Sequence, residues 1–273
     1  MTTPVTVLKR APQVAAIFLG ALILAAIAAP ILAPYAADAL DLANRRAAPS
    51  FAHWFGTDEL GRDVLTRVLF GARVSLAIGL LSALVSVAFG VVLGAAAGYA
   101  GRRVDDLLMR GTDAVLAIPR LPLLMLAAAV LQPGVPALIL LVAAVGWMET
   151  ARVARAEVRA IAARDFVQGA RAIGATPLRV VLRHVLPGVI PAASVSTTLA
   201  IGRGILLEST MSFFGVGVQP PAASWGNMLH QAQTTMTSEP WLAIFPGVCI
   251  LATVLACNAV GDVLSPFDPE RTA

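Results

Sequence analysis

The sequence is poor in charge. Of its 273 residues only 13% are charged, whereas 58% are hydrophobic. A soluble domain carries about 25% charged residues, so this chain would expose insoluble surface in water and must have lipid as its solvent. The basic residues, almost all arginine, lie in short segments between apolar runs. That pattern is typical of membrane orientation rather than of nucleic-acid binding.

Lysine, cysteine and histidine are scarce, and each shortage excludes a kind of site. A Walker A loop needs a Gly-Lys pair in a glycine-rich loop; the only lysine, Lys9, has no such glycines before it. Cys249 and Cys257 lie eight residues apart in one apolar run, about 12 Å on a helix, which is too far for a disulfide. The three histidines are scattered, and no His-Glu-x-x-His motif occurs, so the sequence predicts no metal site.

Six apolar runs are long enough to cross a bilayer as helices, which takes about 20 residues. They predict an all-α polytopic membrane protein with spans at about 13–34, 74–99, 109–131, 137–154, 189–207 and 241–262. Pro119 and Pro122 predict a kink in the third span. The chain then divides into a tail (1–12), the first span (13–34), an outer loop (35–73), a five-helix core (74–262) that includes a charged loop at 155–187, and a second tail (263–273).

Basic residues orient these spans, because cytoplasmic segments carry an excess of Lys and Arg. An inside N-terminus places the seven arginines from Arg152 to Arg183 inside, and both termini with them. The arginines between 45 and 73 would then lie outside and oppose the rule, but the 150–187 segment would be harder to translocate. The first run follows Lys9 and Arg10 like a signal peptide; its length and the later spans favour a retained helix.

Residues 164–187 interrupt the apolar pattern with a charged helical hairpin. Asp165 is expected to cap a first helix, and Gly174 to end it in the left-handed conformation. Thr176 and Pro177 provide a fresh N-cap and first turn, and Pro187 leads into the fifth span. The first helix has an apolar edge at helical spacing, formed by Phe166, Val167, Ala170 and Ile173.

Few ionisable residues fall within the spans: Arg120, Glu149, Arg203 and Glu208. Both acids are expected nearer to an interface than to the midplane, where proton-coupled carriers place carboxylates. Arg203 and Glu208 are five apart, and we expect a local ion pair or snorkelling rather than a substrate site. These features disfavour a self-sufficient secondary carrier, and the lack of a paired nucleophile and base disfavours a membrane enzyme.

Glycines recur at four-residue spacing in the second span, at Gly90, Gly94 and Gly98. Small residues let helices approach closely in lipid. We expect this stripe to serve tight helix packing, and a substrate-lining role is the alternative.

The hairpin resembles the cytoplasmic loop of bacterial ABC-importer permeases. The family pattern is Glu-Ala-Ala, three residues, Gly, nine residues, Ile, one residue, Leu-Pro, and it aligns here with Gln168-Gly169-Ala170, Gly174, His184 and Leu186-Pro187. Gln168, Gly169 and His184 depart from it, and Gln168 removes the carboxylate. Two longer segments resemble the second of the two sister permeases for dipeptides, oligopeptides and nickel: HWFGTDELGRDVLTRVLFGARVSL (53–76) and LLESTMSFFGVGVQPPAASWGNML (206–229).

The resemblance implies the type I importer permease fold, with six spans, in the inner membrane of a bacterium. It also implies a heterodimer with a sister permease, one or two ABC ATPase subunits that bind ATP and Mg, and an extracytoplasmic solute-binding protein. This chain itself would bind no cofactor or nucleic acid and catalyse nothing. Peptides are the expected cargo; nickel, glutathione and opines stay open. The residues expected to dock on the ATPase are Arg164, Asp165, Phe166, Val167, Gln168, Gly169, Ala170, Arg171, Ile173 and Gly174.

Two outer segments remain. Residues 57–73 are expected to form an amphipathic surface helix with Asp63 and Arg67 paired, and 217–227 a Pro-rich loop. These segments either form a scaffold that seals the heterodimer or contact the binding protein. The candidates for that contact are Thr57, Asp58, Gly61, Arg62, Asp63, Gln219 and Trp225.

Overall fold

The computed structural model describes residues 4–264, and within them the chain is helical with no strand. A lone antiparallel bridge joins Thr57 and Asp63. The all-α prediction is confirmed. In chain order the helices are α1 (Pro4–Ile27), α2 (Ala29–Leu32), η1 (Leu42–Asn44), α3 (Val64–Tyr99), α4 (Arg102–Leu116), α5 (Arg120–Leu131), α6 (Val135–Ala144), α7 (Trp147–Ala162), α8 (Asp165–Ala172), α9 (Pro177–Val180), η2 (Val181–Val185), α10 (Leu186–Phe213), α11 (Trp225–Ala232) and α12 (Trp241–Leu264).

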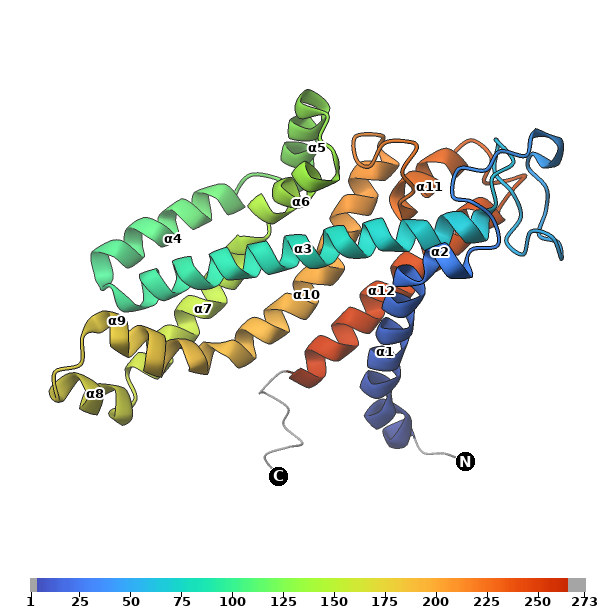
Figure 1. The fold of residues 1–273 in the computed structure, drawn as a ribbon. Helices are drawn as coiled ribbons and strands as arrows, with labels where there is room; N and C mark the ends of the chain where they lie inside the picture. Colours follow the sequence, from blue (N-terminus) through green and yellow to red (C-terminus); the bar gives the residue numbers. More distant parts are fainter. Residues whose placement is uncertain (1–3, 265–273) are drawn as a thin grey trace.

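The long helix α3 is the spine of the molecule (Figure 1). It packs most extensively on α7 and α10, and α12 in turn packs on α10 and α1. The hairpin of α8 and α9 lies at one end of the spine, which we call the hairpin end (Figure 1). The segment 33–63 and α11 lie at the opposite end, which we call the far end.

Three helices are long and apolar enough to cross a membrane alone: Val64–Tyr99, the continuous helix Pro177–Phe213, and Trp241–Leu264. Two pairs qualify as broken spans: α4 with α5, bent by 76°, and α6 with α7, bent by 46°. Pro119 is the last residue of the gap between α4 and α5. Its ring disfavours a helical conformation at the residue before it, so the helix is interrupted there. The apolar part of α1, Pro12–Ile27, is shorter. Each predicted span thus corresponds to an apolar helix or bent pair, but two are broken rather than straight.

The predicted amphipathic helix at 57–73 is wrong, and so is the boundary drawn at 73. Residues 57–63 form a turn, and α3 begins at Val64 and continues without a break to Tyr99. Asp63 caps it, because its carboxylate accepts a hydrogen bond from the Thr66 N–H (2.8 Å). Arg67 lies beside Asp58 instead of Asp63 (3.6 Å).

The glycine stripe of α3 allows close packing against another helix, as predicted. A Cβ atom on Gly90 would lie 2.6 Å from the carbonyl oxygen of Trp147, and one on Gly98 would lie 2.8 Å from the side chain of Val158. Both neighbours belong to α7, so the two backbones touch only because these positions lack side chains. This contact fixes α7, which carries the hairpin, against the spine.

Candidate functional site

The first helix of the hairpin, α8, begins one residue earlier than predicted, at Asp165 itself, which was expected to be its cap. Arg164 occupies the N-cap with extended backbone (φ −71°, ψ 148°), and its side chain makes no capping bond. Asp165 is the first helical residue, and Arg171 lies in the last turn. Both charges have the sign that the helix dipole favours at those ends, so Asp165 stabilises the helix start without being its cap.

Gly174 ends α8 as predicted. It has a φ of +85°, its N–H donates to the carbonyl of Arg171 (3.0 Å), and the N–H of Ala175 donates to Ala170 (3.1 Å). These two bonds define a Schellman motif. A Cβ on Gly174 would meet nothing within 4 Å, so the position needs glycine for its conformation and not for space.

The second arm of the hairpin is continuous with a span. Thr176 is the N-cap and Pro177 the first residue of α9, as predicted. The backbone then widens into a π-helical segment, η2, and continues as α10 through Pro187. The wider turn accommodates a residue that lacks an N–H. The second arm therefore forms one unbroken helix as far as Phe213.

The other arm is tied to α7 and α3 by side chains. The Gln168 amide donates to the carbonyl of Ala162, the last residue of α7 (2.9 Å). The guanidinium of Arg171 lies 4.8 Å from the ring centre of Tyr99, the last residue of α3, a cation–π contact. A glutamate at 168 could not donate that bond as a carboxylate, so the departure from the family pattern has a structural use here.

The apolar edge predicted for α8 is divided between two faces. Val167 packs in a cluster with Val158, Val180 and Val185, and Ala170 is also buried. Phe166 and Ile173, by contrast, are exposed.

The exposed face continues from α8 onto the second arm. Its apolar members are more than half exposed: Phe166 53%, Ile173 87%, Leu178 69% and Leu182 56%. Four exposed arginines flank them: Arg164, Arg171, Arg179 and Arg183. We call these eight residues the hairpin face.

The ionisable residues within the spans are paired differently from the prediction. Arg203 bonds to Glu149, and Arg120 bonds to the other oxygen of the same carboxylate (2.6 Å). The predicted pair of Arg203 with Glu208 is wrong, because Glu208 faces away into a serine cage. This cluster lies between α5, α7 and α10, beside two helix breaks. The sequence predicted the break before α5 from its prolines, but not the break before α7.

Glu208 lies at the centre of a hydrogen-bond network at the far end. Its carboxylate accepts hydrogen bonds from Ser212 (2.7 Å) and Ser75 (3.1 Å). Ser75 in turn accepts the backbone N–H of Trp225 (3.2 Å), and Ser212 accepts that of Val218 (3.0 Å). Burial of the acid is thus offset by hydrogen bonds, and the network joins α3, α10 and the start of α11.

Six of the seven residues proposed for binding-protein contact are buried: Thr57, Asp58, Gly61, Arg62, Asp63 and Trp225. Burial argues against direct contact with a partner and favours the scaffold interpretation. Asp58 accepts hydrogen bonds from the Arg62 side chain (2.7 Å) and from its backbone (3.0 Å). Only Gln219 is exposed. Outside the spans, Asn44 donates to Asp41 (2.7 Å) and holds the pKa of that carboxyl below its ordinary value.

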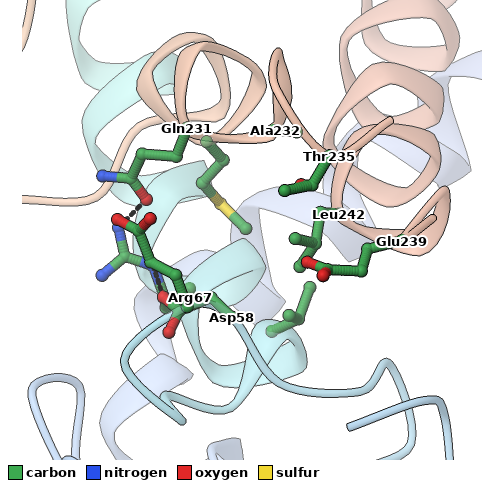
Figure 2. A pocket seen from close by; sticks show the side chains of 10 residues that line it. Asp58, Arg67, Gln231, Ala232, Thr235, Glu239 and Leu242 are labelled. Carbon is green, nitrogen blue, oxygen red and sulfur yellow. Dashed lines mark hydrogen bonds and ion pairs between the residues drawn. The ribbon is translucent and has the colours of Figure 1, made fainter. Parts of the chain in front are cut away.

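Beside Asp58 the scaffold contains a small pocket (Figure 2). Asp58, Arg67 and Gln231 lie on one side of it, and Thr235 and Glu239 on the other. One buried polar atom each of Arg67, Thr235 and Glu239 has no hydrogen-bond partner among the described residues. The cavity measures about 20 Å³, which is room for one water molecule and not for a solute.

Comparison with known proteins agrees with this geometry. Residues 90–267 match the family described as "Binding-protein-dependent transport system inner membrane component". The chain is 40% identical over 258 residues to the glutathione transport system permease protein GsiD of Escherichia coli, covering 94% of this chain and 85% of that one. It is 37% identical over 247 residues to the dipeptide transport system permease protein DppC of Bacillus subtilis, covering 90% and 77%.

A solved structure shares the fold. A chain of the MetNI methionine ABC transporter in an inward-facing conformation superposes with a TM-score of 0.61 at 18% identity, covering 73% of this chain and 95% of that one.

Proposed function

This chain belongs to the family of binding-protein-dependent transport system inner membrane components, and from that premise we propose that it forms half of the pathway of an ATP-driven peptide importer. Members of the family are membrane subunits without a catalytic role of their own, and they work with ATPase subunits. The finer assignment is a heterodimer with a sister permease, supplied by an extracytoplasmic binding protein and driven by subunits that bind ATP and Mg.

The hairpin face is the observation that carries the proposal. Four large apolar side chains stand exposed on a charged hairpin, and such a patch, rimmed by polar groups, marks a protein-interaction site. The flanking arginines suit a groove with acidic edges. The apolar members contribute most of the affinity, because exposed charge pairs contribute little.

The joints of the hairpin explain how docking could drive transport. One arm is continuous with α10, and the other is hydrogen-bonded to α7 through Gln168. A movement of ATPase subunits on nucleotide binding would then turn both helices together, and the pathway would alternate between outward and inward states. On this account the hairpin and both termini lie in the cytoplasm.

Peptides are the proposed cargo. Two relatives are named for dipeptide and glutathione transport, and glutathione is itself a tripeptide. Nickel and opines are the alternatives within the family. Uptake of labelled dipeptide, tripeptide, glutathione and nickel, in cells with and without this chain, decides between them.

The coupling role is tested with Phe166→Asp in the complete importer. The variant should insert normally, since Phe166 is half exposed, but ATP hydrolysis should no longer drive uptake. The measurement is the ratio of ATP hydrolysed to peptide taken up at matched membrane levels. An unchanged ratio would contradict docking at the hairpin face.

A further inference from the structure

The cluster of Arg120, Glu149 and Arg203 carries an unbalanced positive charge. Two guanidiniums share one carboxylate, and no other acid bonds either arginine among the described residues. The three side chains are 29%, 39% and 40% exposed respectively. The charge is therefore open on one side rather than sealed within the chain.

The cluster lies within the candidate membrane-spanning helices, away from their ends. Arg203 is ten residues before the end of α10, which places it about 15 Å from that end at the helical rise. Arg120 begins α5, between the 15 residues of α4 and the 12 of α5. Charged side chains at such depth face a bundle interior or a water-filled cavity, because contact with hydrocarbon is too costly.

The backbone beside the cluster is exposed as well. The gap between α4 and α5 leaves Ala117, Ile118 and Pro119 outside any helix, and all three are exposed. Irregular backbone at membrane depth is tolerated only within protein or along an aqueous cavity. Broken helices of this kind line substrate sites in transporters, where helix N-termini face anionic groups. Arg120 lies in the first turn of α5 and Glu149 in that of α7.

We propose that Arg120 and Arg203 form a subsite for a carboxylate of the transported substrate, in the half of the pathway that this chain provides. The inference rests on the proposed function, and it adds the chemistry that the pathway recognises. A guanidinium presents a planar fork of donors that matches a carboxylate. Glu149 orients both guanidiniums and leaves one net positive charge, which one carboxylate of the substrate neutralises.

The subsite separates the possible cargoes by charge. Every unmodified peptide, glutathione included, carries a free carboxylate, and so does an opine. A free divalent metal cation would be repelled by the excess positive charge. The cluster therefore favours peptide-like substrates over bare nickel.

The test uses the complete importer in proteoliposomes, with one tripeptide as its free acid and as its C-terminal carboxamide. Both are supplied at concentrations that saturate the binding protein, so that the preference of that protein does not enter. We expect the wild type to transport the acid about tenfold faster than the amide, the scale of one charge-assisted hydrogen bond. Arg203→Met should lower transport of the acid about tenfold and change transport of the amide less than about twofold.

Arg203→Lys and Arg73→Met are the matched controls. The first keeps the charge and should restore part of the preference for the acid. The second removes an exposed arginine of α3, whose recorded contact is the ring of Phe70, and should keep the wild-type ratio.

Two outcomes would overturn the subsite alone. The first is an acid-to-amide ratio of transport rates that Arg203→Met leaves unchanged. The second is an equal loss of transport for both peptides, which would mean that the arginines pair with an acid of the sister permease and not with the substrate. Uptake of neither peptide by the wild type would overturn the peptide assignment as well.

Discussion

The hairpin end and the far end of α3 use charged sequence in opposite ways. At the far end, Asp58 and Arg62 are buried and bonded to each other, and Glu208 lies within a cage of serines. At the hairpin end the arginines are exposed, and the buried residues that hold the structure are small and apolar, such as Val167 and Ala170. Charged side chains are thus buried at the far end, whereas large apolar side chains are exposed at the hairpin end.

The contrast shows that a motif rich in charge does not by itself mark a contact surface. The far end needs its polar groups inside because a non-helical segment leaves backbone groups that require partners. The hairpin turn satisfies backbone groups locally through a Schellman motif, so its exposed apolar side chains are not needed to support the turn. Substitutions should therefore affect stability at the far end and coupling at the hairpin.

Trp225→Ala should have the largest effect on stability. The indole is fully buried and donates to the carbonyl of Val68 (3.1 Å), so its removal should cost about 4 kcal/mol of the free energy of unfolding. Thermal unfolding of the purified importer measures this loss. Trp225→Phe, which keeps most of the buried ring, should cost less than half as much; equal losses would contradict the burial.

Asp58→Ala comes next, at about 3 kcal/mol. It leaves Arg62 and Arg67 buried without their carboxylate, and breaking a buried pair is costly for that reason. The neighbouring Glu59 is exposed, so Glu59→Ala should change the free energy of unfolding by less than about 0.5 kcal/mol. If the two variants were equally stable, the far end would not be a scaffold.

Gly174→Ala should cost about 1–2 kcal/mol locally, because a residue with a Cβ is strained at a φ of +85°. Gly169→Ala is the matched control, because alanine is the residue of the family pattern at this docking position. Its Cβ also meets nothing within 4 Å, but Gly169 lies within the helix. We expect peptide uptake to fall in the first variant and to stay at the wild-type level in the second. Comparable uptake by both would show that the Schellman turn is not needed for coupling.

Phe166→Ser should have the smallest effect on stability, less than about 0.5 kcal/mol, since the ring is half exposed. Uptake should nevertheless fall about tenfold. Val167→Ser is adjacent but fully buried and should destabilise the protein by about 2 kcal/mol. Paired unfolding and uptake assays separate the two effects. If Phe166→Ser destabilised the protein and Val167→Ser did not, the assignment of the exposed and buried faces of α8 would be wrong.

The features that the sequence predicted correctly depend on short stretches of chain. Gly174, Thr176 and Pro177 determine the turn between the hairpin helices within a few residues, because backbone conformation and capping act locally. The apolar runs and the glycine stripe from Gly90 to Gly98 were likewise predictable, because their residue spacing is visible within a single segment.

The features that were wrong depend on contacts between distant residues. Arg203 pairs with Glu149 rather than with nearby Glu208, and Arg67 reaches Gln231, 164 residues away, instead of pairing with Asp63. Local spacing cannot indicate such pairs, since each charge takes the best partner that the fold presents. The start of α3 was misplaced for a related reason: its first turns are buried on several sides, so an amphipathic surface pattern was the wrong template.

Site-specific crosslinking from the hairpin tests the central claim most directly. A photoreactive amino acid is placed at Ile173, which is 87% exposed, and in a second protein at fully buried Val167, within the complete importer in native membranes. The account predicts an adduct with an ATPase subunit from position 173, which nucleotide changes in yield, and none from position 167. Adducts only with lipid or with the extracytoplasmic binding protein would contradict docking through this face.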